Sequence, residues 1–126
     1  MNPVSKINLC NLRNLWLPLV LVLSSCSRYT FWQAERLEAK GAFAQAAQAF
    51  QDFARKHPGH AKAGEALFKG GVDLGQRLGQ CAAARPLWED AARTGAQPWA
   101  ARSRQALLEC PDFFPTRAGY EWTYVD

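Results

Sequence analysis

The clearest periodic pattern in the chain lies between residues 41 and 58. Apolar side chains recur there at intervals of three and four, which places them on one face of a helix. Gly41 precedes the run and permits a tight turn, and Pro58 ends it. The pattern therefore predicts the second helix of a helical hairpin. Its apolar face consists of Phe43, Ala46, Ala47, Phe50, Phe53 and Ala54.

Helices are also expected on both sides of this segment. The preceding one should start at Thr30, which can serve as an N-cap, and end at about Lys40. The following one should open at His60 or Ala61 and continue to Leu78. Glycine costs about 1 kcal/mol relative to alanine inside a helix, so the glycines of this third helix indicate close contact with a neighbouring helix. They are Gly64, Gly70, Gly71 and Gly75, and the expected buried stripe is Leu67, Gly71, Leu74 and Leu78.

The pattern of the second helix returns after a turn at Gly79. Cys81, Ala84, Trp88, Ala91 and Ala92 restate Phe43, Ala46, Phe50, Phe53 and Ala54 at a distance of 38 residues. A fifth helix should run from Pro98 to about Glu109, because proline is favoured in the first turn of a helix. Its expected buried residues are Trp99, Ser103, Ala106 and Leu107.

This spacing of small and large residues resembles the tetratricopeptide (TPR) repeat, whose usual period is about 34 residues. The spacing of 38 residues is longer than this period, and the extra residues are most easily placed in the helix between residues 62 and 78. The resemblance implies an all-α fold of about five helices, arranged as two TPR-like antiparallel hairpins and one closing helix. We expect this helical domain to occupy residues 30–110 and to hold partner proteins.

The N-terminus has the pattern of a secretory leader. Residues 1–14 carry Lys6 and Arg13 and no acidic residue, and an apolar run from Leu15 to Leu23 follows. The run is short for a membrane-spanning helix, which needs about 20 residues. It ends in Leu23-Ser24-Ser25-Cys26, which resembles the lipobox of bacterial lipoproteins. Ordinary secretory cleavage near Ser25 is the alternative.

The lipobox implies that residues 1–25 are removed and that Cys26 carries the fatty acyl chains, with residues 26–29 as a lipidated linker. Ser27 resembles the residue that favours sorting to the outer membrane, so the expected location is the periplasmic face of that membrane. Removal of the leader reduces the 15 basic residues to 13, against 11 acidic ones. This small surplus does not indicate a nucleic-acid partner.

The segment FARKHPGHAKAGEALF, together with the lipobox, resembles periplasmic TPR proteins such as the Tol-Pal system coordinator and the TPR component of outer-membrane barrel assembly. The resemblance implies a lipid-anchored adaptor that binds a periplasmic or outer-membrane protein. The alternative is a structural or accessory lipoprotein, or the N-terminal TPR part of a larger lipoprotein with a C-terminal β-domain.

No catalytic or cofactor-binding motif stands out. His57 and His60 have an HxxH spacing, but Pro58 and Gly59 break the helix between them, so we expect a solvent-exposed connector and no metal site. No serine or cysteine has an evident base nearby, and the glycines of residues 69–79 fall inside a helical pattern and do not form a phosphate-binding loop. The sequence predicts neither an enzyme nor a cofactor.

Candidate partner-binding residues lie on the first helix of each hairpin and in the tail. Lys62, Glu65, Lys69, Asp73 and Arg77 fall on one stripe, which is either a mildly basic groove for an acidic or C-terminal carboxylate peptide or a solvated face with ion pairs. The basic candidates are Arg36, Lys62, Lys69, Arg77 and Arg102.

Residues 111–126 change character. Pro111 and Pro115 exclude a continued helix, and the aromatic residues near the end alternate with polar ones, as in a β-strand. This extended tail is either the start of a β-rich domain, an edge that pairs with another protein, or a segment folded back onto the last helix. Its candidate partner-binding residues are Tyr120, Trp122 and Tyr124.

Cysteine positions predict a disulfide in the mature chain. Cys10 leaves with the leader and lipidation uses Cys26, which leaves Cys81 and Cys110 in an oxidising compartment. Both residues lie 14 positions from the turn expected near residues 94–97, so an antiparallel hairpin would place them side by side at its open end. The alternative is two unbonded thiols packed in the core.

Overall fold

The computed structural model describes residues 19–110, and within this range all regular secondary structure is helical, without a strand. This confirms the predicted all-α class and the helical hairpins. The helices are α1 (Leu19–Ala39), α2 (Phe43–Lys56), α3 (Ala63–Val72), α4 (Cys81–Thr94) and α5 (Trp99–Glu109), and a π-helical segment, η2 (Asp73–Arg77), continues α3. The tail at residues 111–126 lies outside the described residues.

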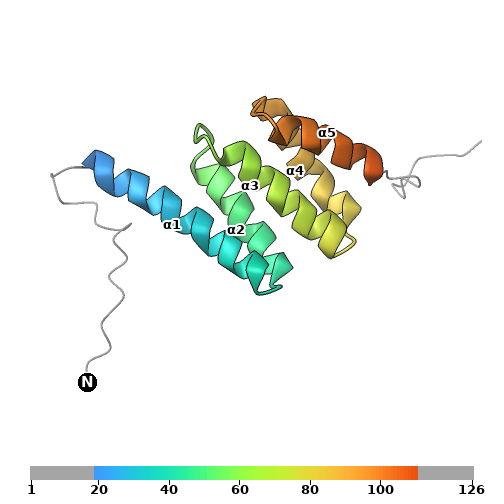
Figure 1. The fold of residues 1–126 in the computed structure, drawn as a ribbon, viewed down its shortest axis with the longest axis horizontal. Helices are drawn as coiled ribbons and strands as arrows, with labels where there is room; N and C mark the ends of the chain where they lie inside the picture. Colours follow the sequence, from blue (N-terminus) through green and yellow to red (C-terminus); the bar gives the residue numbers. More distant parts are fainter. Residues whose placement is uncertain (1–18, 111–126) are drawn as a thin grey trace, which may run out of the picture.

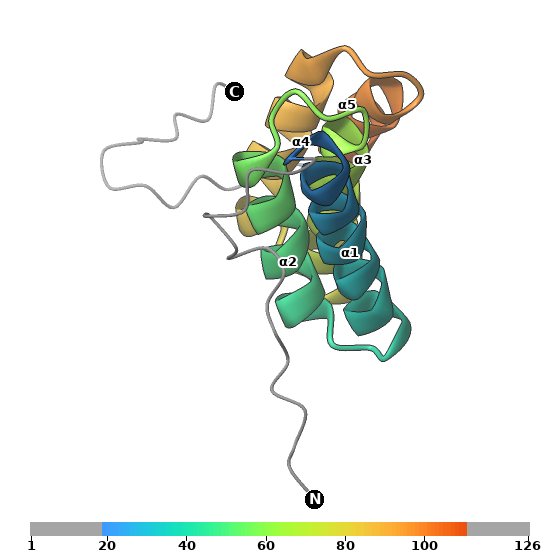
Figure 2. The same ribbon diagram turned by 90° about the vertical axis from the view of Figure 1, so that its left-hand side faces the viewer.

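The helices stack one after another along the chain and form two layers (Figure 1). Viewed along the stack, α2 and α4 lie on one side, and α1, α3 and α5 lie on the other (Figure 2). The central helix α3 has its most extensive contacts with α2 and α4, so it joins the α1–α2 hairpin to the α4–α5 hairpin.

Aromatic side chains fill the core of the first hairpin. The ring of Phe31 meets the rings of Phe50 and Phe53 edge-on, with centroid distances of 5.6 and 5.3 Å. Ala34 and Ala46 are fully buried beside them. Because alanine occupies so little space, α1 and α2 approach closely around the three rings.

The first helix begins earlier than predicted. It starts at Leu19 and passes through Thr30, so the expected N-cap at Thr30 is wrong. The Thr30 hydroxyl instead donates to the carbonyl oxygens of Cys26 and Ser27, at 3.1 and 3.0 Å. Threonine can satisfy its hydroxyl in this way within a helix, and no proline or glycine interrupts residues 19–30.

The α4–α5 hairpin meets the central helix where glycines of α3 and η2 contact the Trp88 ring of α4. A Cβ atom at Gly71 would overlap Trp88 Nε1, and one at Gly75 would lie 2.5 Å from Trp88 Cη2. Gly70 faces Leu87 in the same way, since a Cβ atom at Gly70 would lie 2.9 Å from Leu87 Cδ2. The close helix contact that the sequence predicted at these glycines is confirmed. We call the packing of Trp88 on Gly71 and Gly75 the glycine seam.

The π-helical segment η2 explains part of the long repeat spacing. A π-turn places one extra residue in a helix, and η2 lies within the segment to which the extra residues were assigned. The extra residue rotates the side chains that follow it. Leu78, which was predicted in the buried stripe, is therefore exposed, with 38% of its surface accessible.

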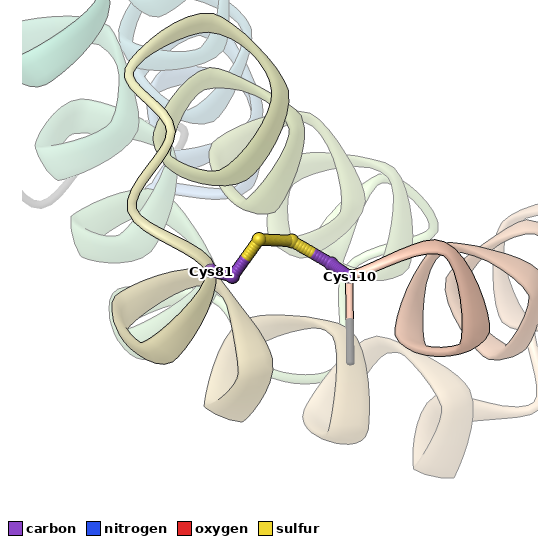
Figure 3. Close-up of a disulfide and its surroundings, with 2 residues drawn as sticks. All are labelled: Cys81 and Cys110. Atoms are coloured by element: carbon purple, nitrogen blue, oxygen red, sulfur yellow. A yellow bond between two sulfur atoms is a disulfide. The ribbon is translucent and has the colours of Figure 1, made fainter. Parts of the chain in front are cut away.

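The last hairpin is closed at its open end by the two cysteines. Cys81 is the first residue of α4, and Cys110 directly follows α5. Their Cα atoms lie 5.6 Å apart, at disulfide distance, and the side chains point toward each other (Figure 3). The predicted juxtaposition is thus confirmed. Closing a loop of 29 residues contributes about 3 to 4 kcal/mol to stability by loop entropy.

The disulfide can be tested by peptide mapping of unreduced protein. Trypsin should release residues 78–93 and 105–117, because the Arg85–Pro86 bond resists cleavage, and the two peptides should appear as one species joined through Cys81 and Cys110. Reduction should separate them. Recovery of both peptides with alkylated cysteines after unfolding without a reductant would show that the bond is absent.

Candidate functional site

A hollow of about 750 Å³ opens beside the first turns of α1 that follow Cys26. Side chains from α1, from the α2–α3 connection and from the residue that precedes α3 surround it. We call it the α1 hollow. Its lining residues are Ser27, Arg28, Phe31, Trp32, Glu35, His57, His60 and Lys62.

The α1 hollow combines aromatic rings with cationic groups. Phe31 is buried and belongs to the core, and the Lys62 ammonium nitrogen lies 4.2 Å from the centre of its ring. Trp32 is 48% exposed, and its ring lies 6.1 Å from that of Tyr29, which is 51% exposed. A cation over an aromatic face is stabilised by the quadrupole of the ring.

The two histidines are more enclosed than predicted. His57 and His60 are half-buried, and their rings lie 5.3 and 5.2 Å from the ring of Phe53, whereas Pro58 and Gly59 between them are exposed, as expected of a connector. The short loop folds back onto the first hairpin because Phe53 offers an aromatic surface at the end of α2. Within residues 26–110, no group of three or more His, Cys, Asp or Glu side chains comes together as a metal site.

His60 also lies next to a serine, which sequence reasoning missed. Its Nε2 atom is 3.5 Å from Ser27 Oγ, and its Nδ1 atom accepts a hydrogen bond from the Lys62 backbone N–H at 3.1 Å. A neutral imidazole that accepts at Nδ1 carries its proton on Nε2. Nε2 then donates to Ser27 and cannot remove a proton from it, so this pair lacks the arrangement of a nucleophilic serine and its base.

Lys69 is engaged in ion pairs. Its Nζ atom donates to Glu35 on α1 at 2.7 Å and lies 3.4 Å from Glu65 on α3. Burial lowers the pKa of Lys69, but the hydrogen bond to Glu35 and the charges of Glu35, Glu65 and Glu38 outweigh burial, so the pKa is raised overall. Lys69 therefore links α1 to α3 and is not available as a free partner-binding cation.

Three other predicted cations are exposed and lie over aromatic rings. Arg36 lies 4.7 Å from the Trp32 ring, Arg102 lies 5.1 Å from the Trp99 ring, and Arg77 lies 5.5 Å from the Phe43 ring. The structure thus distributes the predicted basic stripe over separate positions. The tail candidates Tyr120, Trp122 and Tyr124 lie outside the described residues.

Cys26, the predicted lipidation site, is half-buried on α1, and its thiol is not free in this structure. Lipidation requires a free thiol in the precursor, so acylation at this position stays a prediction. Among the described helices, none combines the length and the apolar character that a membrane crossing requires.

Asp73 departs most strongly from the predicted stripe, because it is fully buried in η2 and not exposed. Neither of its carboxylate oxygens has a hydrogen-bond partner in residues 19–110. The pKa of Asp73 is raised to about 7, mainly by burial and also by the charge of Glu38, although Arg77 and Lys69 act to lower it. Asp73 follows buried Ala66 and Gly70 at intervals of four and three residues, so it lies on the buried face of the helix next to the predicted polar stripe.

No protein-family model, curated protein or solved structure matches the chain.

Asp73 should make stability depend on pH. Its carboxyl binds a proton near pH 7 in the folded state and near pH 4 when unfolded, so the folded state holds more protons between these values, and stability falls as the pH rises through this window. Asp73→Asn should therefore raise the melting temperature at about pH 8, and the gain should shrink as the pH falls toward 4.

The matched control is Asp90→Asn, which changes a more exposed carboxylate on α4 that pairs with Arg93. Exposed pairs contribute little, so this variant should melt close to the wild type throughout. Thermal melts followed by circular dichroism measure both variants. An Asp73→Asn effect of the same size at every pH would contradict the account.

Proposed function

We propose that the protein is a lipid-anchored adaptor of the bacterial cell envelope, with TPR-like hairpins that bind a periplasmic or outer-membrane protein. The lipobox-like segment that ends at Cys26 supports the anchor, and Ser27 favours the periplasmic face of the outer membrane. The helical hairpins support the adaptor role, since stacked hairpins present extended surfaces to partners. In this proposal the chain carries no cofactor and catalyses no reaction.

The observation that carries the docking role is a pair of arginine–tryptophan contacts on the first and last helices of one layer. Arg36 covers Trp32 on α1, and Arg102 covers Trp99 on α5. Arginine and tryptophan are the residues most enriched among those that dominate binding energy at protein interfaces. A guanidinium held over a ring is also preorganised to bind a carboxylate.

Side-chain contacts join the three helices of this layer. Phe68 on α3 lies 5.5 Å from the Trp99 ring, and Lys69 joins α3 to Glu35 on α1. These contacts fix the spacing of the two arginines, so a partner meets a preformed surface. The chemistry of the surface favours an acidic segment or a C-terminal carboxylate of the partner.

Three variants of the full chain, expressed in a bacterial host, test the anchor and the docking surface together. Cys26→Ser should lose metabolic labelling by an alkyne fatty acid and leave the membrane fraction. Arg36→Glu with Arg102→Glu should remain labelled and membrane-bound, but should lose proteins that crosslink to the wild type, because the charge of the surface is reversed.

The matched control, Lys56→Glu with Arg104→Glu, makes the same charge change at two other exposed positions. It should keep both the label and the crosslinked proteins. Fatty-acid labelling that persists in Cys26→Ser would refute the anchor. Equal loss of crosslinks in the control and in Arg36→Glu with Arg102→Glu would refute the docking surface.

A further inference from the structure

We propose that the α1 hollow binds the headgroup of an anionic phospholipid in the membrane surface to which the chain is attached. This inference rests on the proposed function in one respect, because cleavage before Cys26 and acylation of that residue would place the membrane next to the part of α1 that follows Cys26. It assigns the hollow a ligand that is separate from the protein partner.

The position of the hollow is the first argument. Ser27 and Arg28, the two residues that directly follow Cys26, line its wall. Acyl chains on Cys26 would therefore hold the opening of the hollow at the lipid headgroups. A protein partner would have to enter between the hollow and the membrane, whereas a headgroup is already there.

The charge of the hollow is complementary to a phosphate. Arg28 and Lys62 supply cations, and the imidazoles of His57 and His60 add groups that can form hydrogen bonds. The lining holds one carboxylate, Glu35, and Lys69 neutralises it at 2.7 Å. The hollow is thus basic overall, and cations near an anionic membrane surface each contribute about fivefold to binding.

Exposed aromatic side chains surround the same end of α1. Tyr29 and Trp32 are two of the four large hydrophobic side chains that the described residues leave exposed. Both lie within two turns of Cys26. Tyrosine and tryptophan rings prefer the headgroup level of a membrane, so they suit a helix end that rests on the lipid surface.

Headgroup binding would add a second point of attachment to the anchor. Because Cys26 already holds the chain at the surface, the hollow meets lipid at a high effective concentration, and a weak intrinsic affinity is sufficient. The helices would then have a fixed orientation on the membrane, with Arg36 and Arg102 held at a defined distance from the lipid surface.

Photolabelling of the purified full chain in vesicles tests this proposal. The vesicles contain phosphatidylcholine alone or equal parts of phosphatidylcholine and phosphatidylglycerol, with a diazirine probe on the headgroup of one of the two lipids. The phosphatidylglycerol probe should label the segments 27–35 and 57–62 several times more strongly than the phosphatidylcholine probe. Added salt should reduce this preference.

The decisive variant is Arg28→Glu with Lys62→Glu, in which the preference for the phosphatidylglycerol probe should fall to the level of the phosphatidylcholine probe. Lys40→Glu with Arg104→Glu makes the same charge change away from the hollow and should keep the preference. Arg28→Gln with Lys62→Gln should give an intermediate loss, and circular dichroism melts check that each variant is folded.

Equal labelling by the two probes in the wild type, or unchanged labelling in folded Arg28→Glu with Lys62→Glu, would overturn the proposal. Crosslinking of protein partners measures the docking surface separately from lipid binding. Arg28→Glu with Lys62→Glu should keep its crosslinked protein partners, and Arg36→Glu with Arg102→Glu should keep its lipid labelling. Loss of crosslinked partners in Arg28→Glu with Lys62→Glu would instead assign the hollow to a protein ligand.

Discussion

The glycine seam is the contact on which the rest of the structure depends. Trp88 is almost completely buried, and its ring occupies the space that side chains at Gly71 and Gly75 would need. This packing joins the α4–α5 hairpin to α3, which in turn packs on the α1–α2 hairpin. Without it, each hairpin would have only its own small core, and stacked repeats of this kind need neighbouring units to bury a continuous core.

The candidate sites depend on the seam through α3. That helix carries Lys69, which ties α1 to the stack, and Phe68, which contacts Trp99 on α5. The α1 hollow also has Lys62, the residue before α3, on its wall. A shift of α3 would therefore alter the hollow and the arginine–tryptophan layer together. The Cys81–Cys110 pair acts on the other side of the seam, where it holds α4 against α5.

The sequence predicted much of this fold because its signals are local. The spacing of Phe43, Phe50 and Phe53 and the turn at Gly41 define one hairpin, and the same spacing around Trp88 defines the next. The cysteine pair could be predicted because an antiparallel hairpin relates its two ends by simple counting. The glycines of α3 were informative because their cost in a helix requires a compensating contact.

The errors arose where the structure departs from a regular helix or where distant residues meet. The π-turn changes the helical register after Asp73, so Leu78 is exposed, and no residue type announces such a turn. Lys69 was assigned to a partner-binding stripe because its pairing with Glu35 spans 34 positions of sequence. The contact of His60 with Ser27 spans 33 positions and was missed for the same reason.

The stability of Gly71→Ala tests most directly whether the glycine seam holds the structure together. Helix propensity and packing against Trp88 predict opposite changes in the free energy of unfolding of this variant. Helix propensity alone would stabilise the protein by about 1 kcal/mol, whereas overpacking against Trp88 should destabilise it by about 1 to 3 kcal/mol. Gly59→Ala is the control, since no atom lies within 4 Å of a Cβ at that position. In denaturant unfolding, the account predicts a clear loss for Gly71→Ala and a change within about 0.5 kcal/mol for Gly59→Ala. A Gly71→Ala protein as stable as the wild type, or more stable, would contradict it.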